Sequence, residues 1–325
     1  MIALYRRLVS RCTTINQINR VHIALENRLS PLEADVLRHS LRPKCHLLSR
    51  ATMALRRLVL KSAARPFRAT QIEQAREWMG QLAALAAPSG KRHPEGFQRR
   101  RIRRNVVLYS DGGAPADKTL AIAFTGSRQR LMMPVSVFLQ HLDARRVEVV
   151  LLRDSWRDGY HAYRHGIPGV GGSIETLLDA LPHLLSFGRY RKVVAVGTSG
   201  GGFPAVLAAF RLELDAVVSF GGNGPDDPRW VATDGSTGRQ RVVRYRDACA
   251  KPPRVFLAFG QDCPQDRERA EALADAIPSR LCPVGDPTTE VGHTVAYALA
   301  RQGKLTEFLQ STIFANENAG ADTGG

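Results

Sequence analysis

Beyond residue 104 the chain alternates short apolar runs with segments whose apolar residues recur every third or fourth position. The apolar runs, interpreted as strands, cover residues 105–109, 119–124, 147–152, 192–196, 216–220, 254–259 and 281–284. The helical patterns between them cover residues 133–143, 173–187, 201–211, 266–276 and 294–310. Strands that alternate with helices form βαβ units, and these build a mostly parallel sheet with helices on both faces. The pattern predicts a doubly wound α/β domain over residues 105–312 and a disordered tail over residues 313–325.

Residues 1–104 follow the helical period instead. Thr70 and Glu73 have the spacing of a capping box, and the helix that they begin ends before Pro88. Ser30 followed by proline marks a second helix start. We therefore expect a basic, all-helical N-terminal region of three or four amphipathic helices, which ends in a basic loop or linker over residues 88–104.

The excess of positive over negative charge lies entirely within residues 1–110. The net charge is +16, and residues 1–110 hold 22 Lys and Arg against 6 Asp and Glu, whereas the remainder holds 24 of each. A solvated helix surface is the reading we favour, and an acidic partner or an anionic membrane surface are the alternatives. Nucleic acid is disfavoured, because the sequence has no helix-turn-helix spacing, zinc-finger pattern or aromatic RNA-binding motif.

Composition places the protein among ordinary globular chains. Of the 325 residues, 44% are apolar, which suffices for one large domain or two smaller ones, and no apolar run has the length of a membrane span. The N-terminus has no continuous apolar segment of a secretory signal. The five cysteines are scattered and never form a CxxC pair. They argue against a disulfide framework and against a zinc site, and they lead us to expect a cytoplasmic protein without a bound metal.

A serine lies among glycines where a predicted strand meets a predicted helix. Residues 197–201 read Gly-Thr-Ser-Gly-Gly, the G-x-S-x-G pattern of a nucleophile elbow. Such a turn holds the serine in a strained conformation at the carboxyl edge of the sheet. It leaves no room for side chains at Gly197 and Gly201. Ser199 is therefore the candidate nucleophile.

A serine becomes a good nucleophile only beside a base, and the base needs a group that orients it. The strand at residues 254–259 runs into Asp262, and the loop after residues 281–284 reaches His293, the only histidine after Ser199. The order serine, acid, histidine is the one that this architecture requires. Asp266 is a rival acid, but it can instead cap the helix that follows, so we favour Asp262.

These residues carry a resemblance to the α/β-hydrolases over residues 105–312. It rests on GTSGG at residues 197–201, on FLAFGQDCPQDRERAEALADAIP from residue 256 and on EVGH ending at His293. The resemblance implies the α/β-hydrolase fold, a Ser-His-Asp triad and an oxyanion hole. One oxyanion donor would be the amide of Gly200. The other would be the amide of Ser127 or Arg128, although the loop there departs from the common HGGG form.

The function predicted from these residues is that of a serine hydrolase acting on an ester, thioester or amide through an acyl-enzyme, with no metal or organic cofactor. Two alternatives stay open: an acyltransferase on the same triad, and a non-catalytic hydrolase-like scaffold that binds a partner through its basic helices. A dinucleotide-binding domain is disfavoured because residues 197–202 do not meet G-x-G-x-x-G.

Two further segments could shape a substrate site. The connection at residues 222–253, where such proteins often carry a lid, is rich in arginine, and solvated surface is favoured there over recognition of an anionic substrate. Trp156, Tyr160 and Tyr163 follow a strand end and are candidates either for the pocket lining or for core packing.

Overall fold

The computed structural model describes residues 96–154, 160–231, 235–285 and 290–315. The helices predicted before residue 88 and most of the predicted tail lie outside the described residues. The chain divides into two compact units, one of residues 98–132 and 142–325 and the other of residues 1–97 and 133–141. The described part of the latter contains the short helix α6 (Val135–Leu139). The described sheet lies wholly in the former.

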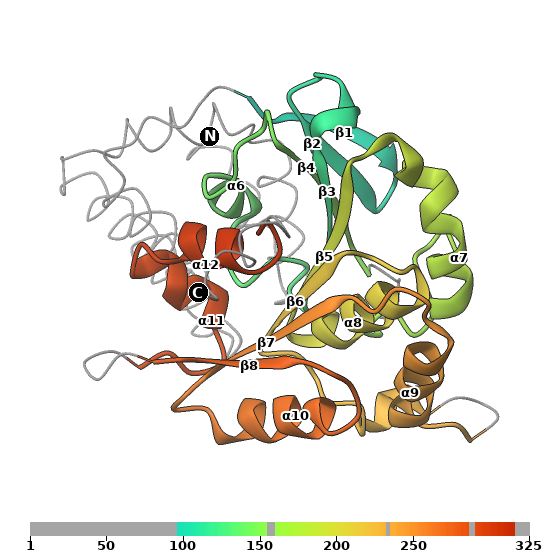
Figure 1. Ribbon diagram of the computed structural model, residues 1–325, viewed down its shortest axis with the longest axis vertical. Helices are drawn as coiled ribbons and strands as arrows, with labels where there is room; N and C mark the ends of the chain where they lie inside the picture. The colour runs from blue at the N-terminus through green and yellow to red at the C-terminus, as the bar shows by residue number, and fades with distance from the viewer. Residues whose placement is uncertain (1–95, 155–159, 232–234, 286–289, 316–325) are drawn as a thin grey trace, which may run out of the picture. The chain divides into compact units, whose positions relative to one another are not determined.

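The sheet has eight strands in the order β1-β2-β4-β3-β5-β6-β7-β8 (Figure 1). β2 pairs antiparallel with β1 and β4, whereas the remaining neighbours pair in parallel. The mostly parallel α/β sheet expected from the alternation of strands and helices is therefore confirmed. The strands are β1 (Gln98–Arg103), β2 (Val106–Ser110), β3 (Thr119–Phe124), β4 (Val147–Leu152), β5 (Lys192–Thr198), β6 (Ala216–Phe220), β7 (Arg254–Gly260) and β8 (Arg280–Val284).

Helices cover both faces of this sheet (Figure 1). One face carries α7 (Ile174–Leu185), α8 (Gly202–Arg211), α9 (Gly238–Ala248) and α10 (Pro264–Ala274), whose apolar residues join the main hydrophobic cluster. The other face carries α11 (Val295–Arg301) and α12 (Leu305–Ser311). β6 shows the division, because Val217 belongs to the main cluster while Phe220 packs on Phe308 of α12, with ring centroids 5.5 Å apart.

The central strands form where the sequence is predominantly apolar, with single polar residues such as Glu148 in β4. Every residue of β3, β4 and β6 is buried. A strand buried on both faces shows no alternation of polar and apolar residues, and such strands are typical of parallel sheets. The predicted bounds of these three strands agree with the observed ones for that reason.

The structure differs from the sequence expectation at four places. Residues 98–103, expected as linker, form the exposed edge strand β1, which pairs with β2. The connection at residues 222–253 contains α9, which packs on α8. The helix expected over residues 294–310 is two helices, separated at Gly303 with φ of 72°. Ile313, assigned to the tail, is fully buried. Among the described residues, the helices are too short or too polar to cross a membrane.

Candidate active site

Ser199 lies in a strained turn at the carboxyl end of β5. Its φ is 51°, a left-handed conformation that costs a non-glycine residue free energy, and the short turn η3 (Ser199–Gly201) leads directly into α8. A Cβ on Gly197 would lie 2.3 Å from the carbonyl oxygen of Gly201, and one on Gly201 would lie 2.4 Å from that of Phe124. Both positions therefore require glycine, as the spacing of the motif predicts.

His293 reaches Ser199 from the loop before α11. Its Nε2 lies 2.9 Å from the Ser199 Oγ, and its Nδ1 lies 2.7 Å from Oδ2 of Asp266. The exposed fraction of the imidazole is 42%, whereas that of the Asp266 side chain is 1%. A hydroxyl, an imidazole and a buried carboxylate thus lie in one hydrogen-bonded row, with the hydroxyl at its open end.

The acid beside the imidazole is Asp266 and not Asp262, which we favoured from the sequence. α10 begins at Pro264, two residues earlier than expected, so Asp266 lies in its first turn with its side chain toward His293. Its predicted capping role is absent, because the N-cap residue is Cys263 and that position makes no side-chain capping bond.

Asp262 has a different contact. Its carboxylate accepts hydrogen bonds from the backbone amides of Val291, at 2.9 Å, and Gly292, at 2.9 and 3.0 Å. These two residues directly precede His293. Asp262 therefore holds in place the loop that carries the imidazole. It positions His293 through these hydrogen bonds to the loop backbone.

The turn after β6 completes the surroundings of the row, and it was missed from the sequence. Gly221 has φ of 52°, and a Cβ there would lie 2.9 Å from Oδ2 of Asp266 and 3.1 Å from Nδ1 of His293. The amide of Asn223 donates to the Ser199 carbonyl at 3.3 Å. The sequence signal that could have identified this turn is the pair Gly221-Gly222 at the carboxyl end of β6, the strand adjacent to β5.

The loop after β3 lies alongside Ser199. A Cβ on Gly126 would lie 3.2 Å from the Cβ of Ser199. The Gly126 amide donates to the carbonyl of Arg130 at 3.1 Å, and the Thr125 amide donates to the Tyr163 hydroxyl at 2.7 Å. These two amides are therefore engaged within the fold. Ser127 and Arg128, which the sequence suggested as oxyanion donors, are the next two residues of this loop. Both are exposed.

The buried carboxylate of Asp154, after β4, holds residues 161–163 in place, and Tyr163 of this segment contacts the loop after β3. Asp154 accepts hydrogen bonds from the amides of His161, at 2.7 Å, and Tyr163, at 2.8 Å. Burial raises the pKa of Asp154, although these two bonds oppose the rise. Ala162 and Tyr163 have φ of 51° and 64°, so this anchor also stabilises a left-handed turn.

The arginines of the 222–253 connection are mostly paired with acids. Arg229 contacts Asp227 through two side-chain bonds of 3.0 and 2.7 Å, and these bonds hold the pKa of Asp227 below its usual value. Further pairs are Arg239 with Asp226, Arg246 with Asp247 and Arg241 with Glu175. Arg241 is buried and its partner Glu175 lies in α7, whereas the other three pairs agree with a solvated, internally neutralised surface.

The described residues contain no group of three or more His, Cys, Asp or Glu side chains placed to hold a metal ion. The row of hydroxyl, imidazole and carboxylate at Ser199, His293 and Asp266 offers acid–base and nucleophilic chemistry.

Comparison with known proteins finds similarity among solved structures. Neither a family model nor a curated protein sequence matches the chain. Dienelactone hydrolase from Anabaena variabilis is 18% identical, with 67% of this chain and 100% of that chain covered and a TM-score of 0.46. Esterase B from Lactobacillus rhamnosis is 13% identical, with 80% and 94% covered and a TM-score of 0.47. Enterochelin esterase from Shigella flexneri is 15% identical, with 68% and 60% covered and a TM-score of 0.44.

The fold is assigned from the strand order of this chain and from where the strands place the site residues. A mostly parallel sheet carries a strained serine between a central strand and its helix, and an acid and a histidine follow in that chain order. The described part of this chain has the α/β-hydrolase fold.

Proposed function

We propose that the protein is a serine hydrolase that cleaves an ester, thioester or amide through an acyl-enzyme. The observation that carries the proposal is the continuous row of contacts from the Ser199 Oγ through His293 to Asp266, at 2.9 and 2.7 Å. A carboxylate can only accept hydrogen bonds, so the Nδ1 proton of the imidazole faces Asp266 and Nε2 faces the serine hydroxyl as an acceptor. This is the tautomer in which histidine serves as a base for serine.

In the acylation step, the Oγ of Ser199 forms a bond to the substrate carbonyl carbon while its proton passes to Nε2 of His293. The carbonyl electron pair moves to the oxygen, which becomes the oxyanion. When this intermediate collapses, the bond to the leaving alcohol, thiol or amine breaks, and the leaving group takes the proton from Nε2. Ser199 then carries the acyl group as an ester.

In the deacylation step, a water molecule gives its proton to Nε2 as its oxygen bonds to the acyl carbon. The second intermediate collapses with release of the acid, and the Ser199 Oγ recovers its proton from His293. Asp266 keeps the ring oriented in both steps and stabilises its charged form. The Asp266 carboxylate is almost entirely buried, so water screens its side of this attraction little.

The assay for this proposal is covalent labelling with a fluorophosphonate, followed by mass mapping of the modified peptide. We expect the label on Ser199 alone, and we expect Ser199→Ala to abolish both labelling and hydrolysis of a nitrophenyl ester. The melting temperature of that variant should stay within a few degrees, because alanine replaces serine at the same positive φ. A wild-type chain that is folded yet unlabelled would overturn the proposal and leave the scaffold alternative.

A further inference from the structure

The hydroxyl of Tyr160 lies between the two segments that flank Ser199. It donates a hydrogen bond of 3.2 Å to the carbonyl of Thr125, in the loop after β3. On the other side, a Cβ built on Gly200 would lie 2.5 Å from the same hydroxyl oxygen. Glycine at position 200 is thus what allows the phenol to come this close to the turn of the candidate nucleophile.

Tyr163, three residues further on, provides an internal comparison. Its hydroxyl accepts from the Thr125 amide at 2.7 Å and donates to the Leu152 carbonyl at 2.8 Å, and the residue is fully buried. The hydroxyl of Tyr160 has, among the described residues, the single long bond to Thr125, and the residue is only partly buried. The hydrogen-bonding capacity of Tyr163 is used by the fold, whereas the donor of Tyr160 is held weakly.

We infer that the Tyr160 hydroxyl is a third donor to the oxyanion, beside the amide of Gly200 and an amide of the loop after β3. The inference rests on the proposed serine hydrolase function. Tyrosine hydroxyls serve as oxyanion donors where they are fixed in a site that excludes water. Rotation about the bond from the ring to the hydroxyl oxygen is enough to turn the proton from the Thr125 carbonyl to an oxyanion beside Gly200, so the ring stays in place.

The ring of Tyr160 is positioned before any substrate binds. It packs edge-on against Tyr163, with ring centroids 6.3 Å apart, and the turn that joins the two tyrosines is anchored by Asp154. Preorganisation of this kind is what makes a donor effective, because little reorganisation is then needed when charge develops on the substrate oxygen.

The charge state of the phenol agrees with this role. Burial raises the pKa of Tyr160 well above its ordinary value, and the neighbouring Tyr163 and Asp154 raise it further, although Arg229 opposes the rise. The hydroxyl therefore keeps its proton at neutral pH, where it remains a donor.

The test compares fluorophosphonate labelling and nitrophenyl ester hydrolysis by the wild type, Tyr160→Phe and Tyr163→Phe. We expect Tyr160→Phe to lower kcat and the labelling rate constant on the order of a hundredfold, as loss of one oxyanion donor does, with KM and melting temperature almost unchanged. Tyr163→Phe should instead lower the melting temperature, because it removes the 2.7 Å acceptor of the buried Thr125 amide and leaves that amide only the longer bond of 3.4 Å to the Leu152 carbonyl.

A more acidic phenol separates donation from packing. A fluorinated tyrosine placed at position 160 alone keeps the ring, but it loses its proton at lower pH. We expect the alkaline limb of the pH profile of kcat to move to lower pH, a shift that a purely structural role would not produce.

The outcomes separate the two proposals. A wild type that the fluorophosphonate does not label refutes the serine hydrolase function itself. A wild type that is labelled, with Tyr160→Phe within threefold of it in kcat and no movement of the alkaline limb, refutes only the role of Tyr160.

Discussion

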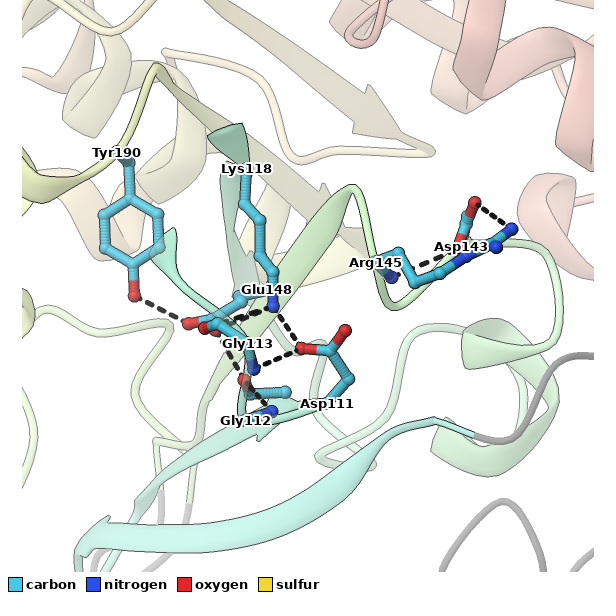
Figure 2. Close-up of polar contacts among 9 residues, drawn as sticks. Asp111, Gly112, Gly113, Lys118, Asp143, Arg145, Glu148 and Tyr190 are labelled. Atoms are coloured by element: carbon cyan, nitrogen blue, oxygen red, sulfur yellow. Dashed lines mark hydrogen bonds and ion pairs between the residues drawn. The ribbon is translucent and has the colours of Figure 1, made fainter. Parts of the chain in front are cut away.

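Two clusters of acidic, basic and hydroxyl groups lie at opposite ends of one sheet. At the amino ends of β3 and β4, the ammonium of Lys118 contacts Asp111 and, at 3.5 Å, Glu148 (Figure 2). The same Glu148 accepts from Ser110 at 2.5 Å and from Tyr190 at 2.7 Å. At the carboxyl end of β5, Ser199 meets His293 and Asp266.

The two clusters differ in their exposure to solvent and in how far their polar groups pair with one another. The Lys118 and Glu148 side chains are 3% and 4% exposed, and Figure 2 shows the lysine, carboxylate and phenol groups pointing at one another. The imidazole of His293 is 42% exposed. Polar groups that satisfy one another inside the protein stabilise strand ends, whereas a row that ends at an accessible hydroxyl has a group left to react. Both clusters contain acidic, basic and hydroxyl groups, so the residue types alone do not distinguish a stabilising cluster from a reactive one.

The largest expected effect is on kcat, and it distinguishes the carboxylate of Asp266 from that of Asp262. Asp266→Asn should lower kcat by roughly 10⁴-fold, because the amide no longer enforces the correct tautomer of the imidazole. Asp262→Asn should cost far less, because it weakens bonds to the backbone of the loop and not to the ring. Steady-state kinetics on a nitrophenyl ester checks both, and equal losses would contradict the assignment of Asp266.

At the opposite end of the sheet, Lys118→Met should destabilise the fold and spare the chemistry. It leaves two carboxylates, of Asp111 and the buried Glu148, without their shared cation, a change that typically costs about 3–5 kcal/mol of unfolding free energy. Denaturant titration measures that loss, and we expect kcat per folded molecule to stay the same.

Lys251→Met is the matched control. Lys251 is 62% exposed and pairs with Asp215 at 2.8 Å, so its replacement should cost less than about 1 kcal/mol of unfolding free energy. A loss for Lys118→Met as small as that for Lys251→Met would show that the buried cluster contributes little to stability.

The smallest effect is a pH dependence of stability from Asp111. Burial raises the pKa of this carboxyl, but the hydrogen bond from Lys118 and the Gly113 amide outweigh it, and the pKa lies below its ordinary value of 3.8. Its contribution is therefore present above pH 3.8, and it is lost as the pH falls from there through the lower folded-state pKa. Denaturant titrations between pH 5 and 2, on the order of the window that such carboxyls span, should show a shallower acid loss for Asp111→Asn. Identical slopes for the two proteins would contradict this.

The sheet and the serine turn could be predicted because each leaves a local mark on the sequence. Buried parallel strands are predominantly apolar runs, so β3, β4 and β6 were found with their correct ends. The turn at Ser199 demands glycine at Gly197 because of a local clash with the carbonyl oxygen of Gly201, and at Gly201 because of a clash with Phe124 of the neighbouring strand β3. His293 was found by elimination, since no other histidine follows the serine.

The remainder depended on tertiary contacts. Asp262 and Asp266 both follow β7 within a few residues, and the start of α10 at Pro264 decides which side chain faces the imidazole. β1 was missed because its six residues include four arginines and lack apolar alternation, so pairing with β2 alone makes it a strand. Gly221 acquires its role only because β6 lies beside β5.

The arginine-rich β1 also bears on how copies of this protein meet. An outermost strand presents unpaired backbone groups to which another chain could add a strand, and clustered like charges discourage that addition. The guanidinium groups of Arg99, Arg100, Arg101 and Arg103 would confront the same four in a second molecule. At the other margin, Pro283 in β8 has no amide hydrogen to offer. Electrostatic repulsion on one border and a missing donor on the other therefore guard the sheet against edge-to-edge aggregation.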